Sequence, residues 1–289
     1  MAEHKAGALQ SLPAGRFAAF SFVDQITAIE GTKRVTGRYT IPAGVTYFPV
    51  SLVAEALGQL AAWVAMSSVG FSHRPVAALA GDTRIFAQPR PGDTLELIVD
   101  IESCDRDGIA YRGRAMVGDT VVLELLDTLG YMLDIADFDD PQALAADFAL
   151  LTAGGRAPGF FQGVPEPVLK DLQHETGHTL QAQLSVPEHA PFFLDHFPRR
   201  PVFPATLMLD AQLQLAQRIA AEHGGVPVHV TRIAGVKVRA FTLPGASLTL
   251  SAVLAEPGKD DPEPILIKVA ALAAGRTIAG AKMFFAPDS

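Results

Sequence analysis

Apolar and polar residues alternate along several stretches of the chain, and this period of two predicts β-strands that bury one face. The strands are expected at residues 20–29, 34–41, 94–101, 110–117, 121–133, 179–186, 229–239, 247–254, 265–273 and 277–285. Residues 50–68 and 205–223 follow another pattern, because they are apolar on nearly every side and contain no proline. Each of them predicts one long buried helix. Strands that cover an apolar helix place the protein in the α+β class.

The chain repeats itself, so that one unit is present twice. Glu55 and Gln59 in the first helical segment recur 155 residues later as Asp210 and Gln214, and the strands that follow match at a similar offset. The strand before each helix recurs after only 145 residues. The first unit therefore lacks about ten residues at the place where the second unit carries residues 191–200.

The repeat also suggests the domain organisation. We expect a first unit at residues 15–137 and a second unit at residues 166–289, joined by a linker at residues 138–165. The linker is rich in Asp, Pro, Ala and Gly, and a short helix is expected within it at residues 141–151. Two fused units form an obligatory pair, because the linker keeps their effective concentration high.

Composition indicates a globular protein with a well-developed core, since 49% of the residues are apolar and 19% are charged. The formal net charge of −8 argues against nucleic acid or an anionic membrane surface as the main partner. An acidic partner protein would need a local basic patch. The candidates are Arg199, Arg200, Arg232, Lys237 and Arg239, although ordinary solvated charges would give the same sequence.

The sequence gives no sign of a metal or a cofactor. The single cysteine, Cys104, excludes an internal disulfide, and no Cys/His cluster, HExxH motif or Gly-rich phosphate loop is present. The N-terminal residues lack the apolar core of a secretory signal. The longest apolar run, at residues 52–69, is interrupted by Glu55 and Gln59, so we expect no membrane span and a cytoplasmic location.

Residues 191–214 are the strongest candidate for chemistry. His196 lies in a turn punctuated by prolines, and Asp210 follows in an otherwise apolar helix. A carboxylate is costly to bury among apolar neighbours, so such a group is neutralised or paired. A histidine and a carboxyl group of raised pKa form a pair suited to proton transfer near neutral pH.

The spacing of this stretch resembles the active-site segment of the bacterial 3-hydroxyacyl-[acyl-carrier-protein] dehydratases. The matching residues are two aromatics, a His-Phe-Pro turn, a Pro-Val-Phe-Pro turn, an acid and a glutamine: Phe192, Phe193, His196, Phe197, Pro198, Pro201, Val202, Phe203, Pro204, Asp210 and Gln214. Asp195 departs from the Gly or Cys of the family pattern, and Ala205 departs from its Gly. The acid is Asp210 instead of Glu, which is more similar to the branch that both dehydrates and isomerises.

The resemblance implies a fold. Members of the family have the hot-dog fold, in which an antiparallel sheet wraps around a central apolar helix. With the repeat, the expectation is a double hot-dog: two antiparallel sheets, each wrapped around its own helix, joined as a pseudo-dimer. Such units normally pair through an edge strand, which makes one continuous sheet and removes an exposed edge.

The resemblance also implies an activity, the dehydration of a 3-hydroxyacyl thioester to a trans-2-enoyl thioester in fatty-acid or polyketide-type synthesis. In the family the histidine of one unit works with the acid of the other. His196 is therefore expected to face Glu55, while Asp210 would be a second or vestigial acid. Gln59, one turn after Glu55, would orient the carboxyl group. The alternative is that His196 uses Asp210 within its own unit.

Further positions are implied to bind the substrate. The backbone N–H of Ala205, at the start of the second helix, would stabilise the developing enolate. Phe197, Val202 and Phe203 would line an apolar tunnel for the acyl chain. The expected partner is an acyl carrier protein or an acyl-coenzyme A thioester, and the fused pair is a possible homo-oligomer. Two rival functions are a hot-dog acyl thioesterase and a non-catalytic acyl-binding partner.

Overall fold

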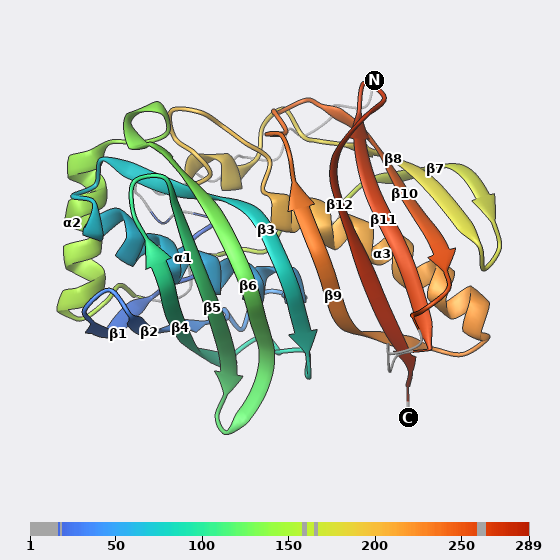
Figure 1. The fold of residues 1–289 in the computed structure, drawn as a ribbon, viewed down its shortest axis with the longest axis horizontal. Helices are drawn as coiled ribbons and strands as arrows, with labels where there is room; N and C mark the ends of the chain where they lie inside the picture. The colour runs from blue at the N-terminus through green and yellow to red at the C-terminus, as the bar shows by residue number, and fades with distance from the viewer. Residues whose placement is uncertain (1–16, 18, 158–160, 165–166, 259–263, 289) are drawn as a thin grey trace, which may run out of the picture.

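The computed structural model describes residues 17, 19–157, 161–164, 167–258 and 264–288, whose helices and strands are labelled in Figure 1. The expected unit boundaries at residues 15, 165, 166 and 289 lie outside this described part. Within it, the strands form one 12-stranded sheet. The strands are β1 (Gln25–Glu30), β2 (Arg34–Thr40), β3 (His73–Ile85), β4 (Thr94–Cys104), β5 (Gly108–Val117), β6 (Thr120–Asp134), β7 (Leu169–Glu175), β8 (Thr179–Ser185), β9 (Val228–Val238), β10 (Ser247–Ala255), β11 (Ile265–Ala273) and β12 (Arg276–Pro287).

The sheet has the same strand order in both directions from its centre. Strands β3 and β9 pair antiparallel there, with Leu79 opposite Lys237 and Thr83 opposite Ile233. Outward from β3 follow β6, β5, β4, β2 and β1, and outward from β9 follow β12, β11, β10, β8 and β7. The sequence repeat is therefore a structural repeat. Its two halves join through edge strands into one continuous sheet, which is the double hot-dog arrangement.

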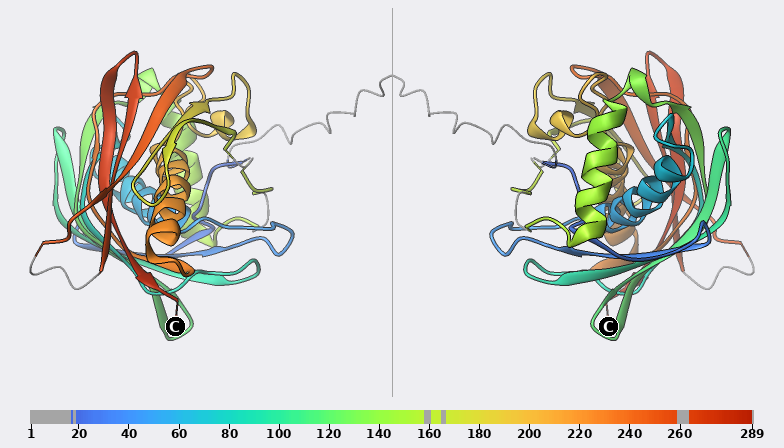
Figure 2. Two further views of the ribbon diagram at one scale, coloured as in Figure 1. Left: turned by 90° about the vertical axis from the view of Figure 1, so that its right-hand side faces the viewer. Right: turned by 90° about the vertical axis from the view of Figure 1, so that its left-hand side faces the viewer.

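One long helix lies inside the curve of each half of the sheet, as Figure 2 shows: α1 (Val50–Ser68) and α3 (Ala205–Gly224). Each helix starts directly after a proline, Pro49 or Pro204, whose fixed φ suits a helix N-terminus. Both helices match the expectation from the apolar pattern to within one residue. Their apolar surface is covered by the sheet, and side chains such as Leu57 of α1 have no exposed area.

Helix α1 is long and apolar enough to cross a membrane by length and composition alone, with a mean hydropathy of 1.4. This differs from the expectation that its polar residues make it fall short. However, 67% of the relevant window is buried inside the protein. The core helix of a folded protein has the same composition, so the burial of α1 accounts for its hydropathy.

A third helix follows the first half of the sheet and packs against its helix α1 and strand β1. The side chain of Asp140 caps the N-terminus of helix α2 (Pro141–Ala153). It accepts hydrogen bonds from the N–H groups of Gln142 (3.0 Å) and Ala143 (2.9 Å). Phe148 of α2 packs on Trp63 of α1, with ring centroids 6.5 Å apart. A one-turn helix, η1 (Ile135–Asp137), connects β6 to this region.

Two strands were not expected from the sequence, and the strand expected at residues 20–29 begins only at Gln25. Strand β3 was not predicted, because its sequence carries Pro75, Gly81 and a run of alanines without alternation. It is a strand because it pairs with β6 on one side and β9 on the other. Strand β7 was also missed, since it is an edge strand with six of its seven residues exposed.

Candidate active site

His196 is held by the loop that follows a short helix, η2 (Pro191–Leu194). Its backbone N–H donates to the carbonyl of Phe192 (2.9 Å), and its carbonyl accepts from the N–H of Val202 (3.0 Å). The imidazole Nδ1 lies 2.9 Å from the carbonyl oxygen of Val202. Because a carbonyl oxygen can only accept, Nδ1 carries the proton, and Nε2 of the neutral ring is left to accept one.

Aromatic rings pack against this imidazole from two sides. Phe197 stacks on it with centroids 3.9 Å apart, and Phe20 meets it edge-on at 5.6 Å. Burial lowers the pKa of His196, while the nearby carboxyl group of Glu55 opposes part of this effect. The ring is therefore neutral at neutral pH, which is the form that a general base requires.

Glu55 lies on α1, and both of its carboxyl oxygens accept a hydrogen bond. The Gln59 side-chain amide donates to Oε1 (3.0 Å), and the hydroxyl of Thr206 donates to Oε2 (2.9 Å). Gln59 is fixed in turn, since it also donates to the Phe20 carbonyl (3.0 Å) and accepts from the Phe22 N–H (2.7 Å). The carboxyl group is thereby held in one orientation by residues of both halves.

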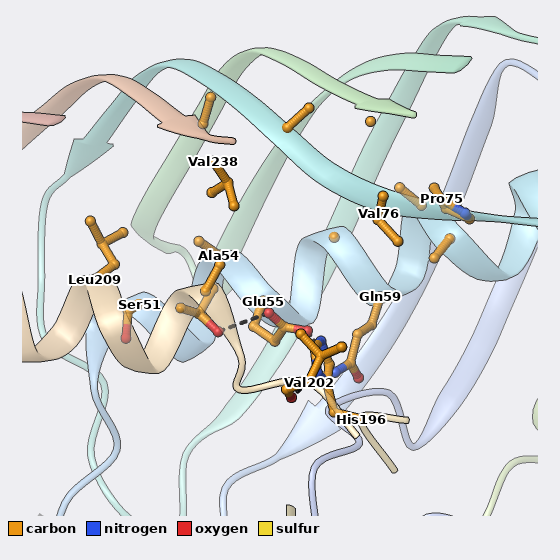
Figure 3. A pocket seen from close by; sticks show the side chains of 18 of the residues that line it. Ser51, Ala54, Glu55, Gln59, Pro75, Val76, His196, Val202, Leu209 and Val238 are labelled. Atoms are coloured by element: carbon orange, nitrogen blue, oxygen red, sulfur yellow. Dashed lines mark hydrogen bonds between the residues drawn. The ribbon is translucent and has the colours of Figure 1, made fainter. Parts of the chain in front are cut away.

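A cavity of about 280 Å³ lies between α1, α3 and the central strands. Its lining includes all but one of the site residues expected from the sequence: His196, Glu55, Gln59, Ala205, Phe197, Val202 and Phe203. Figure 3 shows Glu55 and His196 close together at this cavity, one from each half of the chain. The remaining residue, Asp210, is not among the described residues that line it.

Asp210 occupies a different environment. Its side chain is buried (5% exposed), and the Gln214 side-chain amide donates to Oδ2 (3.2 Å). Burial raises the pKa of Asp210 to about 6. Burial together with the charge of Asp210 raises the pKa of Tyr47 to about 12, so a tyrosine of the first half lies near this acid. Asp210 and Glu55 therefore occupy the same position in the sequence repeat but lie in different surroundings.

The start of α3 lies at the same cavity. Ala205 is the first residue of this helix and lines the cavity. The first N–H groups of a helix have no acceptor within the helix, and the helix dipole is positive at this end. The arrangement can bind and stabilise an oxygen that gains negative charge.

Comparisons with known proteins point to one family. A family model described as "ApeI-like: ApeI dehydratase" matches residues 172–261. The 3-hydroxyacyl-[acyl-carrier-protein] dehydratase FabZ of Clostridioides difficile is 31% identical over 115 residues, which cover 36% of this chain and 80% of that protein. The chain belongs to the 3-hydroxyacyl-[acyl-carrier-protein] dehydratase family.

Similarity to other members of this dehydratase family is more local. The FabZ protein of a Polaromonas species is 44% identical over 55 residues, which are 19% of this chain. This chain covers only 38% of the length of that relative. The match to this relative therefore covers only a part of each protein.

Solved structures show that the dehydratase family shares its fold with enzymes of other activities. The 12:0-ACP thioesterase from Umbellularia californica is 11% identical, with a TM-score of 0.53 over 90% of this chain and 96% of that chain. The dehydratase domain of the polyketide PpsC from Mycobacterium tuberculosis is 16% identical, with a TM-score of 0.50 over 91% and 96%. At such identities the likeness shows the fold alone.

Three residues near the site were missed from the sequence. Thr206 contacts Glu55 from the other half of the chain. The guanidinium of Arg74 lies 3.8 Å from the centroid of the Phe197 ring and contributes to lowering the pKa of His196. Asp195, noted only as a departure from the family pattern, accepts hydrogen bonds from the backbone N–H groups of Ala19 (2.8 Å) and Phe20 (2.7 Å).

Only a weak signal marked these three residues. In the sequence repeat Ser51 corresponds to Thr206, so a hydroxyl recurs at this position of both helices. Arg74 lies in β3, which the sequence pattern does not predict as a strand. The role of Asp195 depends on a segment 175 residues away in the chain, and no local pattern records such a contact.

Proposed function

We propose that the protein dehydrates a 3-hydroxyacyl thioester to a trans-2-enoyl thioester, in fatty-acid or polyketide-type synthesis. The observation that carries this proposal is that His196 and Glu55, from opposite halves of the chain, line one cavity that Asp210 does not line. The substrate class named for the FabZ relatives supports the same reaction. The thioester is attached to an acyl carrier protein or to coenzyme A.

The proposed step begins at C2 of the substrate, where the thioester carbonyl makes the proton acidic. Nε2 of His196 takes this proton, and its electron pair becomes the second bond between C2 and C3. The bond from C3 to the hydroxyl oxygen breaks, and the protonated carboxyl group of Glu55 gives its proton to that oxygen. Water leaves, and a proton transfer from His196 to Glu55 through solvent restores the starting state.

Groups that keep their positions assist the step. Hydrogen bonds from Gln59 and Thr206 orient the carboxyl group of Glu55 toward the leaving oxygen. The N–H at Ala205 donates to the thioester oxygen as negative charge develops there. The acyl chain extends along the apolar wall of the cavity that includes Phe197, Val202 and Phe203.

The proposal assigns one complete site to each chain. We propose units at residues 15–137 and 166–289 with a linker at residues 138–165, of which only the second carries the histidine loop. In this assignment the first unit contributes Glu55 and the second contributes His196. Asp210 is then a vestigial acid, because the loop that would bring a histidine to it is missing from the first unit.

Mass spectrometry of acyl thioesters tests the proposal. The wild-type protein should convert a 3-hydroxyacyl thioester to a product lighter by one water. His196→Ala should abolish this conversion, Glu55→Gln should reduce it comparably, and Asp210→Asn should reduce it much less. An active Glu55→Gln beside an inactive Asp210→Asn would refute the assignment of the acid.

The same assay separates the rival functions. Free thiol released from a plain acyl thioester would identify a thioesterase, whose fold this chain shares. Binding of both thioesters without conversion of either would identify an acyl-binding partner. Loss of water from the hydroxyacyl substrate, and no loss of thiol, is the expected result.

A further inference from the structure

Gln212 lies in the middle of α3 and lines the cavity, although only 2% of this residue is exposed. Its amide nitrogen Nε2 is buried and has no hydrogen-bond partner in the part of the chain that the structure describes. A side-chain amide carries two N–H donors, and burying them unpaired is unfavourable. The last torsion of a glutamine side chain is broad, so a small rotation turns these donors toward a molecule in the cavity.

The strands of the second half offer Gln212 no side-chain acceptor at the cavity. Among the described residues, β9 and β12 contribute to the lining only residues without a polar side chain: Ile233, Val236, Val238, Ala279 and Gly280. The backbones of these strands are paired with each other in the sheet, and β9 also pairs with β3. An acceptor for Gln212 therefore has to come from a molecule that enters the cavity.

The fold does not require a polar residue at this position of the helix. In the sequence repeat Gln212 corresponds to Leu57, at the same offset of 155 residues that relates Glu55 to Asp210. Leu57 is fully buried in the core of the first half, and it is not among the described residues that line the cavity. A leucine thus suits this place in the fold and avoids the unpaired donors. The glutamine is explained by the cavity and not by the packing of helix on sheet.

Gln212 lies at a distance from the proposed reaction centre but along the same cavity. Ala205, at the start of α3, lines this cavity too. Two turns of helix separate Ala205 from Gln212, which is about 10 Å along the helix axis. Figure 3 shows Leu209, one turn before Gln212, on the other side of Glu55 from His196. An acyl chain whose thioester lies at Ala205 can therefore follow α3 and bring its far end to Gln212.

A second buried polar group at this end of the cavity comes from the other helix. Ser51 of α1 lines the cavity, and its hydroxyl is buried without a hydrogen-bond partner among the described residues. Ser51 precedes Glu55 by one turn of α1, so the two side chains lie on the same side of the helix. Figure 3 shows Ser51, like Leu209, on the side of Glu55 that is away from His196. Polar groups from both halves thus border the far part of the cavity.

The chemistry of these groups limits the class of ligand. The amide of Gln212 and the hydroxyl of Ser51 are neutral, and so are the hydroxyls of Thr128 and Thr242, which are buried without partners elsewhere in the lining. Neutral groups cannot balance a buried charge, so a charged end of the acyl chain is unfavourable here. A ketone or hydroxyl oxygen needs only a hydrogen bond, and the Gln212 amide can donate one to it.

We propose that Gln212 is a specificity residue, which donates a hydrogen bond to an uncharged oxygen far along the acyl chain. The preferred substrate then carries a ketone or hydroxyl group besides its 3-hydroxyl group, instead of a plain alkyl chain. The proposal rests on the proposed function, because it names the substrate class of the same site. A buried donor of this kind discriminates strongly, since an analogue that lacks the oxygen leaves the donor unpaired.

Steady-state kinetics should compare the pantetheine thioesters of 3-hydroxydecanoic acid and 3-hydroxy-9-oxodecanoic acid, because a ketone oxygen can only accept a hydrogen bond. The test variant is Gln212→Leu, whose new side chain is the one found at the equivalent position of the first half. Gln212→Met, which keeps the length of the side chain without its donors, is a second variant. Gln217→Leu is the matched control, since it makes the same change at an exposed position of α3 that does not line the cavity.

The wild type should have a kcat/KM at least about ten-fold higher for the 9-oxo substrate than for the plain one. Gln212→Leu and Gln212→Met should abolish this preference by lowering kcat/KM for the 9-oxo substrate alone, and Gln217→Leu should keep it. The proposal is overturned if the wild type does not prefer the ketone, if Gln212→Leu lowers kcat/KM equally for both substrates, or if the control loses the preference too.

A binding measurement separates this proposal from the dehydration itself. Decanoyl-pantetheine and 9-oxodecanoyl-pantetheine lack the 3-hydroxyl group and cannot lose water, so calorimetry with them does not depend on catalysis. If the wild type dehydrates no substrate, the proposed function fails, and this measurement still decides whether Gln212 recognises the oxygen. Tighter binding of the 9-oxo analogue that is lost in Gln212→Leu and kept in Gln217→Leu supports the proposal. Equal binding of the two analogues by the wild type overturns it.

Discussion

The hydroxyl of Thr206 donates a hydrogen bond to the carboxyl group of Glu55, with 2.9 Å between Oγ1 and Oε2. Thr206 lies in the first turn of α3, and Glu55 lies on α1 in the other half of the chain. The first turn of α3, whose residues Ala205 and Thr206 line the cavity, therefore also orients the proposed proton donor. This contact ties the orientation of the acid to the packing of one half against the other.

Thr206 should act as a positioning residue for Glu55. Thr206→Val keeps the shape of the side chain and removes the hydroxyl, so we expect kcat to fall about ten-fold, equivalent to one hydrogen bond of about 1.4 kcal/mol. The KM should change little. Thr206→Ser should restore most of kcat, because it restores the donor. A Thr206→Val protein with full kcat would show that the contact has no part in catalysis.

The pH dependence of activity should report His196. Only the neutral imidazole accepts a proton, so kcat/KM should fall as the pH drops through the pKa of His196. Burial lowers this pKa, and the midpoint of the acid limb should therefore lie below the ordinary imidazole value of 6.5. A midpoint above 6.5 would show that the ring is better solvated or more strongly paired than the structure indicates.

Nuclear magnetic resonance separates the effect of Glu55 on this pKa from catalysis. The carboxyl group of Glu55 raises the pKa of His196 against the effect of burial. Glu55→Gln removes the ionised form of this carboxyl group, so the His196 ring protons should titrate at a lower pH than in the wild type. The signal is assigned by its loss in His196→Ala. An unchanged titration would show that the two side chains do not interact.

The sequence predicted the parts of the fold that follow local periodicity. The bounds of α1 and α3 could be found because each helix is apolar around its whole circumference and starts after a proline. Strand β3 could not be found, since its strand conformation comes from partners on both sides instead of from alternation. Strand β7 could not be predicted either, because it lies at the exposed edge of the sheet and has no apolar face to detect.

The candidate site could also be predicted in part, because some of its residues lie in local sequence patterns. His196 lies in a dense local motif, and the internal repeat led from Asp210 to Glu55. The repeat could not show that the two acids have different surroundings, with Glu55 at the cavity and Asp210 beside Tyr47. Arg74 reaches the site only because β3 runs along it. The catalytic assignments of His196 and Glu55 remain predictions.

Asp195 should hold the N-terminal segment against the site. Its carboxylate accepts hydrogen bonds from the N–H groups of Ala19 and Phe20, and Phe20 packs edge-on against His196. Asp195→Ala leaves both donors without this acceptor, and we expect about 1–3 kcal/mol of destabilisation.

Hydrogen exchange locates this effect. Amide exchange at residues 19–22 should accelerate in Asp195→Ala and much less in Asp195→Asn, which keeps an acceptor oxygen. Equal protection of these amides in the wild type and in Asp195→Ala would show that the segment is held by its aromatic packing instead.

Asp210 should reduce the stability of the folded protein at neutral pH. Burial raises its pKa to about 6, whereas the unfolded chain ionises near the ordinary value of 3.8. Between these two values the folded protein binds more protons than the unfolded chain, so the free energy of unfolding falls as the pH rises. The loss is complete above the folded pKa. A difference of about two pKa units corresponds to a cost on the order of 3 kcal/mol.

Asp210→Asn removes this cost while keeping an oxygen that accepts from Gln214. Denaturant unfolding should show the variant to be more stable than the wild type at about pH 8, with the difference disappearing toward about pH 4. His196→Ala serves as a comparison, because it leaves Asp210 unchanged and should not reproduce this dependence. A variant less stable at high pH would mean that the ionised carboxylate has a favourable partner. Asp210 would then be a maintained ionic site, and its description as a vestigial acid would be wrong.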